Sequence, residues 1–506
     1  MNPFILLMIG LVGQWGLGLT VAAVLLRFPL SATTSHRQDR GDRYAEWGGL
    51  GLVLGIAVTS YLSFLWSLCG GQLGRPLSLT LTAIGLVAGA IVLLIHRIRT
   101  VRSRRADPNG SLQIGIVPNA HGTSGRALCR TAVTLILFLI AATIVQAVLT
   151  PQRLWDERAI FGLKAEILFV DRSIDSPALL DPDFVQYHPR YPLLLPLAEQ
   201  HIYALLGTID DRWSKLVSPL LYAGMVLTFA GVLTRHMRSD SAWLFALLLA
   251  TVPALMPWEY GFLSVQADAP VACFHAVALL YLWDWFQMNH RDDKPPVVVN
   301  NLLIAGLSSG MTIFTKDEGI ALFAVDAFAV VLIGLTVSRL SLRQVMASTG
   351  LFVMVVTAIT APWFLQRSRL PSTTEMSYFS RISLAALIAG AGTLWWSVPH
   401  LIRRMFAEAL QWGLAWWASL LALMTQPRRA REPGQLLLLF DVAGALAALL
   451  IAGMIAPTAV QEHIGGSSHR FLIQLIPVAV LFVAGQWGCS PRDRDTPFFP
   501  AEMARP

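Results

Sequence analysis

Apolar runs of about 17–22 residues recur along the whole chain, and polar segments separate them. A run of this length crosses a ~30 Å hydrocarbon core as an α-helix. The pattern therefore predicts an all-α polytopic membrane protein with about 13 transmembrane helices. Several of the expected helices are shorter than these runs, so their ends are approximate. The expected helices are Phe4–Leu26, Trp47–Leu68, Leu77–Ile95, Ala132–Leu149, Leu216–Leu233, Trp243–Trp258, Ala269–Trp285, Leu302–Phe314, Ile320–Leu335, Leu351–Phe364, Ile382–Trp396, Leu436–Ile455 and Phe471–Trp487.

Arginine and lysine gather in connections that fall on one side of the membrane if the expected helices alternate in direction. Such loops mark the cytoplasmic side, so the N-terminus and the long polar segment Thr150–Lys215 should face outward. We expect an integral protein of a bacterial inner (plasma) membrane, with its site facing the periplasm or exterior. The basic connections are Arg27–Arg43, His96–Arg130, Arg235–Arg238, His290–Lys294 and Arg339–Arg343.

The composition agrees with this class, because 55% of the residues are hydrophobic and only 14% are charged. The net charge of +7 comes mostly from the cytoplasmic connections, which favours contact with anionic lipids of the bilayer over binding to nucleic acid. No glycine-rich nucleotide loop is present, and the four cysteines are scattered without metal-binding spacing. No cofactor is therefore indicated, although a divalent metal stays possible and its ligands unknown.

Thr150–Lys215 is a long, acid-rich outer segment, and such loops carry function in membrane proteins. We expect Leu154–Leu168 to form an amphipathic helix at the outer membrane surface, with its charges toward water. A partly desolvated carboxylate at Asp156, with Glu157 beside it, could act as a base. Alternatively, both acids only stabilise the first turn of a helix through the macrodipole.

Four further polar motifs are expected on the same outer side. They are Tyr191-Pro192-Leu193-Leu194-Leu195-Pro196, Ala267-Asp268-Ala269-Pro270, Thr315-Lys316-Asp317-Glu318-Gly319 and His469-Arg470-Phe471-Leu472. With Asp156-Glu157, their order resembles the GT-C superfamily of membrane glycosyltransferases, especially its protein O-mannosyltransferase and aminoarabinose lipid A transferase branches. The resemblance covers roughly residues 131–487.

The resemblance implies a transferase that moves a sugar from a polyprenyl-phosphate carrier to a glycan, lipid or protein acceptor at the outer face. The catalytic acids would be Asp156, with Glu157 beside it, and Asp268. Cations stabilise a departing phosphate. The candidate cations are Arg190, Lys316 and Arg470, and the candidate acceptor and loop residues are His188, Tyr191, Glu318 and His469.

Several of these residues have a structural alternative. Asp268 could cap the helix that begins at Ala269. Lys316 could pair only with Asp317 or Glu318, and Arg470 could extend to the membrane surface as long basic side chains do. His188 and His469 fit polar loop residues better than metal ligands.

The expected organisation has three parts: N-terminal helices and a basic loop in residues 1–130, a catalytic unit in residues 131–490 that contains the outer segment, and a cytoplasmic tail in residues 491–506. Members of the resembled family carry their acidic loop after the first helix, whereas here three additional helices and a basic loop come before the helix that leads into it. A rival function is a transporter or flippase for a lipid-linked glycan, whose charges would lie near the membrane midplane. Another rival is a glycan polymerase or ligase, which would depend on arginine and histidine more than on Asp156.

Overall fold

A computed structural model describes residues 2–26, 37–106, 123–256, 260–291, 299–338, 340–372 and 378–488. These residues form helices joined by turns, and no strand occurs among them. Eleven of the helical segments are long and apolar enough to cross a membrane. The protein is therefore an all-α polytopic membrane protein, as the hydrophobic pattern predicts.

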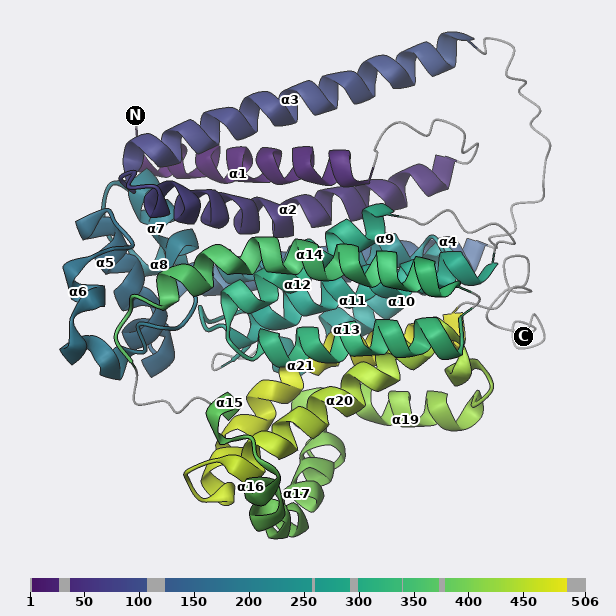
Figure 1. Ribbon diagram of the computed structural model, residues 1–506. Helices are drawn as coiled ribbons and strands as arrows, with labels where there is room; N and C mark the ends of the chain where they lie inside the picture. The colour runs from purple at the N-terminus through teal and green to yellow at the C-terminus, as the bar shows by residue number, and fades with distance from the viewer. Residues whose placement is uncertain are drawn as a thin grey trace.

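The long helices account for most of the bundle (Figure 1). They are α1 (Pro3–Leu25), α2 (Arg37–Leu68), α3 (Arg75–Ala106), α4 (Thr123–Leu149), α9 (Val217–Leu233), α11 (Asp268–Arg291), α12 (Val299–Thr315), α13 (Gly319–Thr336), α14 (Leu342–Arg367), α17 (Leu394–Ala407), α20 (Pro433–Ile455) and α21 (Val460–Gly488). The shorter helices between α9 and the C-terminal pair are α10 (Ser239–Ala250), η3 (Pro253–Leu255), α15 (Tyr378–Arg381), α16 (Leu384–Gly390), η4 (Ala391–Thr393), α18 (Ala409–Trp412), α19 (Ala415–Thr425) and η5 (Arg429–Arg431).

The expected count of about 13 spans is not confirmed. The described part of the run Trp243–Trp258 contains the end of α10, which has only 12 residues and ends at Ala250 before Pro253, and the last two residues of the run lie outside the described residues. At 1.5 Å per residue such a helix is about 18 Å long, which is too short for the hydrocarbon core. The run Leu302–Phe314 forms α12, which has 17 residues and is not among the eleven candidate spans.

α1 packs closely on both α2 and α3, and all three helices also contact the rest of the bundle (Figure 1). Glycines permit this approach, because a Cβ at Gly18 would lie 1.9 Å from the backbone oxygen of Gly51. α2 in turn contacts α9, where a Cβ at Gly49 would lie 2.6 Å from the backbone nitrogen of Thr228. The residues before the outer segment therefore share an extensive helix interface with the part expected to be catalytic.

The outer segment folds into short helices at one end of the bundle (Figure 1). They are η1 (Asp156–Gly162, a π-helix), α5 (Leu163–Asp171), α6 (Pro177–Leu180), η2 (Pro182–Tyr187), α7 (Leu194–Leu206) and α8 (Asp211–Ser214). The expectation that charges of Leu154–Leu168 project to water is wrong for Glu157 and Lys164, which are 1% and 0% exposed. Both side chains point into the protein, where Glu157 contacts Lys215 and Lys164 donates to the backbone oxygen of His188.

Candidate active site

Asp268 is the buried centre of a charge cluster at the same end of the bundle as the outer segment. It is the first residue of α11 and is 0% exposed. Its Oδ1 accepts a hydrogen bond from Lys316 Nζ at 2.9 Å, and its Oδ2 accepts two from Arg470, at 3.1 Å from Nε and 2.9 Å from Nη2. Both carboxylate oxygens are thus occupied, and their cations offset the cost of burying the charge. Asp268 therefore positions Lys316 and Arg470.

Arg470 connects this buried carboxylate to the edge of the cluster. Its Nη2 lies 2.7 Å from Asp156 Oδ2, and its guanidinium lies 4.8 Å from the centre of the Tyr260 ring. His469 packs edge-on against the same ring, with centroids 4.6 Å apart. The side chains of Arg470 and Asp156 are 25% and 22% exposed, so the cluster opens from Asp268 toward solvent at Asp156.

Lys316 forms the other arm of the cluster. Its Nζ lies 2.9 Å from Glu318 Oε1, and Glu318 Oε2 accepts a hydrogen bond of 2.6 Å from Gln474 Nε2. Burial alone would lower the pKa of Lys316, but the carboxylates of Asp268 and Glu318 raise that pKa above its ordinary value, so the amine is a cation. Lys316 does pair with its neighbour Glu318, and it reaches Asp268 as well. The neighbouring Asp317 pairs with Arg367.

The sequence places these residues at helix ends that suit their charges. Asp268 begins α11, where the partial positive charge of the helix favours an acid. Lys316 follows the last residue of α12, where the partial negative charge favours a cation. Arg470 and Gln474 lie four residues apart and so share one face of α21. The site is thus assembled from segments far apart in sequence.

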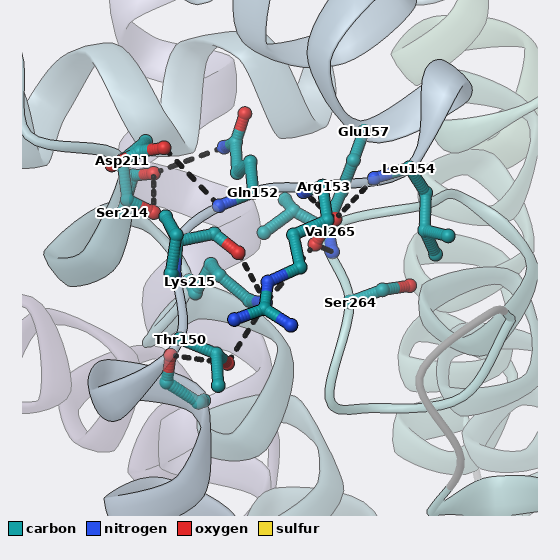
Figure 2. A network of polar contacts seen from close by, with 12 residues as sticks. Thr150, Gln152, Arg153, Leu154, Glu157, Asp211, Ser214, Lys215, Ser264 and Val265 are labelled. Atoms are coloured by element: carbon teal, nitrogen blue, oxygen red, sulfur yellow. Dashed lines mark hydrogen bonds and ion pairs between the residues drawn. The ribbon is translucent and has the colours of Figure 1, made fainter.

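Glu157 belongs to a different network, although it is adjacent to Asp156 (Figure 2). Its Oε2 accepts hydrogen bonds from the backbone N–H groups of Arg153 and Leu154, at 2.9 and 3.2 Å. Its Oε1 accepts one from the N–H of Val265 at 3.1 Å and lies 3.3 Å from Lys215 Nζ. Glu157 therefore joins the outer segment to the chain before α11 and to the start of α9. These contacts give Glu157 a structural role, and the catalytic role expected for it stays a prediction.

His188, Arg190 and Tyr191 lie in the turn before α7. The backbone oxygen of His188 accepts a hydrogen bond from Lys164 Nζ at 2.5 Å, and the His188 ring stacks on Tyr191 with centroids 5.0 Å apart. Arg190 donates from Nε and Nη2 to the carbonyl of Leu370, at 3.1 and 3.0 Å. Within the described part of the chain no interaction joins Arg190 to the Asp268 cluster, so its phosphate-binding role stays a prediction.

Two members of the cluster were missed by sequence reasoning. Tyr260 lies beneath the Arg470 guanidinium, and Gln474 holds Glu318. Gln474 carried a usable signal, because it is a polar residue four positions after Arg470 in the otherwise apolar stretch 471–485. Tyr260 gave no such signal, because its contact with Arg470 depends on how the turn before Asp268 folds.

Glu199 is a further buried acid, on α7 of the outer segment. It is 0% exposed, and its Oε2 accepts a hydrogen bond of 2.5 Å from Gln152 Nε2. Burial raises the pKa of Glu199 to about 8, so this side chain holds its proton at neutral pH. It lies within an apolar run, which gave no reason to single it out.

Comparison with protein-family models and with curated proteins finds no match to this chain. The fold and the cluster by themselves define an integral membrane protein with many apolar helices and a partly exposed charged site at one end of its bundle.

Proposed function

We propose that this protein is a membrane glycosyltransferase, which moves a sugar from a polyprenyl-phosphate carrier to a cell-envelope acceptor at the outer face of the membrane. The observation that carries this proposal is the meeting of Asp156, Asp268, Lys316 and Arg470 in one cluster. These are the acids and cations that the resemblance to GT-C glycosyltransferases implies for acceptor activation and phosphate binding.

Asp156 is the residue we assign as the base. It is 22% exposed, and its hydrogen bond from Arg470 uses Oδ2, which leaves Oδ1 for an acceptor hydroxyl. As the acceptor oxygen bonds to the anomeric carbon of the sugar, Asp156 accepts the hydroxyl proton. The bond between the anomeric carbon and the phosphate oxygen breaks, and its electron pair leaves with the polyprenyl phosphate. Asp268 cannot serve equally well because both its oxygens are engaged.

Lys316 and Arg470 are the cations we assign to the donor phosphate. In the cluster they face the carboxylates of Asp156, Asp268 and Glu318, so a phosphate must compete for them. Asp156 is the weakest competitor for Arg470, since it makes one contact with the guanidinium whereas Asp268 makes two. Donor binding at Arg470 would thus release Asp156 and leave it as a base beside the acceptor.

A transporter for a lipid-linked glycan is the second candidate. Ionisable residues inside membrane-spanning helices are typical of transport pathways, and His275, Asp326 and Asp441 lie within α11, α13 and α20. Transport would not require Asp156 as a proton acceptor. The two candidates therefore differ in what the loss of this one carboxylate should do.

Mass spectrometry of cell-envelope glycans from a strain that lacks the gene tests the proposal. We expect one glycan modification to disappear and to return with the wild-type gene but not with Asp156→Asn. Asp183→Asn is the matched control, because Asp183 is an exposed acid of the same outer segment. Full restoration by Asp156→Asn would favour the transporter, and an unchanged glycan profile in the deletion strain would contradict both candidates.

A further inference from the structure

His275, Asp326 and Asp441 meet inside the helix bundle. They come from α11, α13 and α20, and they are 1%, 0% and 0% exposed. His275 Nε2 lies 3.5 Å from Asp326 Oδ2 and 3.1 Å from Asp441 Oδ1. One ligand atom from each of the three side chains lies within 4.8 Å of the others.

The polar atoms of this triad contact one another at ion-pair distance but with poor hydrogen-bond geometry. Both ring nitrogens of His275 and all four carboxylate oxygens of Asp326 and Asp441 are buried and unpaired by hydrogen-bond geometry. Among the described residues, the ion-pair contacts of both carboxylates go to His275 alone. A protonated imidazole carries one positive charge against the two carboxylates, and a negative charge left uncompensated is costly in an apolar interior.

The triad is distinct from the candidate active site. His275 follows Asp268 by seven residues on α11, which is about 10 Å along the helix axis. All three residues lie within candidate membrane spans, where ionisable side chains are rare and usually functional. Each is a single polar residue in an apolar run, so the sequence gave no sign that they converge.

We propose that His275, Asp326 and Asp441 bind one divalent transition-metal cation of the zinc class. The donor set fits, because Zn²⁺ accepts imidazole nitrogen and carboxylate oxygen at about 2.0–2.2 Å. A neutral imidazole and two carboxylates carry two negative charges, which a divalent cation neutralises. Ca²⁺ and Mg²⁺ fit less well, since they favour oxygen ligands and higher coordination numbers. With three protein ligands, the fourth tetrahedral position would hold water.

Such an ion would join α11 to α13 and α20 in the middle of the bundle. It would thereby fix the helix whose first residue, Asp268, holds Lys316 and Arg470. The inference does not depend on the proposed transferase activity, because metal binding and stability can be measured without any substrate.

The experiment uses the full-length protein, purified in detergent and stripped of metal with a chelator. Zn²⁺ or Mn²⁺ is added, the unbound ion is removed, and the retained metal is measured by elemental mass spectrometry. The variants are His275→Gln, Asp326→Asn and Asp441→Asn. His463→Gln is the control, because His463 lies outside the triad and contacts Tyr378.

We expect one Zn²⁺ per chain in the wild type and in His463→Gln, and substoichiometric Zn²⁺ in all three triad variants. Zn²⁺ should also raise the thermal unfolding midpoint of the metal-free wild type but not that of the variants. Two results overturn the proposal: a wild-type protein that takes up neither ion, or triad variants that retain as much Zn²⁺ as the wild type. The first result decides the question even if the variants fail to fold, and it would leave the triad as a protonated histidine between two carboxylates.

Discussion

Replacing Glu157 with glutamine removes one negative charge from the buried network of Figure 2 and changes the side-chain volume little. Lys215, which is 3% exposed, then loses its carboxylate partner 3.3 Å away. The amide NH₂ group of the glutamine must also replace one carboxylate oxygen, so it faces backbone N–H donors at Arg153 and Leu154 or at Val265. At least one of these hydrogen bonds is lost.

The size of the effect follows from burial. Removing one partner of a buried ion pair leaves an uncompensated charge and costs about 3–5 kcal/mol. For the neighbouring change Asp156→Asn we expect less than about 1 kcal/mol, because Asp156 is 22% exposed and Arg470 keeps Asp268 as a partner. Two adjacent carboxylates should therefore differ sharply in their contribution to stability.

Thermal unfolding of the two purified variants in detergent, followed by size-exclusion chromatography, measures this difference. Glu157→Gln should unfold at a clearly lower temperature than the wild type, whereas Asp156→Asn should unfold close to it. A Glu157→Gln variant as stable as the wild type would refute the structural role, and so would an Asp156→Asn variant that is the less stable of the two.

Further predictions concern pH, topology and the donor. The pKa of Glu199 is about 8 in the fold against an ordinary value near 4.5, so its protonated form contributes stability that is complete below about pH 4.5 and is lost as the pH rises through 8. The free energy of unfolding changes by on the order of 5 kcal/mol over this range. In Glu199→Gln the thermal unfolding midpoint should therefore decrease less steeply between pH 5 and 8 than in the wild type. An unchanged slope would contradict the raised pKa of Glu199. A reporter fused after Arg172 should read as outside and one after Arg238 as cytoplasmic, and two fusions on one side would defeat the orientation. Arg470→Gln should weaken the apparent affinity for a polyprenyl-phosphate sugar more than Arg190→Gln does, because Arg470 lies in the Asp268 cluster and Arg190 contacts a backbone carbonyl. Steady-state kinetics at varied donor concentration measure both affinities. A larger loss of affinity in Arg190→Gln would make Arg190 the main phosphate ligand.

Residue pattern alone predicted the membrane class and most of the long helices. Hydrophobic periodicity depends on local sequence, which explains why these predictions succeed. The alternation of helices across a membrane also brought the outer motifs to one end, and Asp156, Asp268, Lys316 and Arg470 do meet there.

Features that depend on tertiary packing could not be predicted from the sequence. Adjacent residues on a helix point in different directions, and nothing local shows that Asp156 faces the cluster whereas Glu157 faces Lys215. The burial of Glu199 and the meeting of His275 with Asp326 and Asp441 likewise arise from helices that pack together after they form. The motifs expected on one side of the membrane therefore do not include all of the buried ionisable residues.

The most direct test of the account is sugar transfer by the purified protein. Polyprenyl-phosphate sugars extracted from a strain that lacks the gene supply the donor, and envelope material from the same strain supplies the acceptor, so the sugar need not be known beforehand. We expect the wild type to transfer the sugar and Asp156→Asn to do so about 10²–10⁴-fold more slowly, while it stays folded. Absence of transfer by the folded wild-type protein, or near wild-type transfer by Asp156→Asn, would contradict the account.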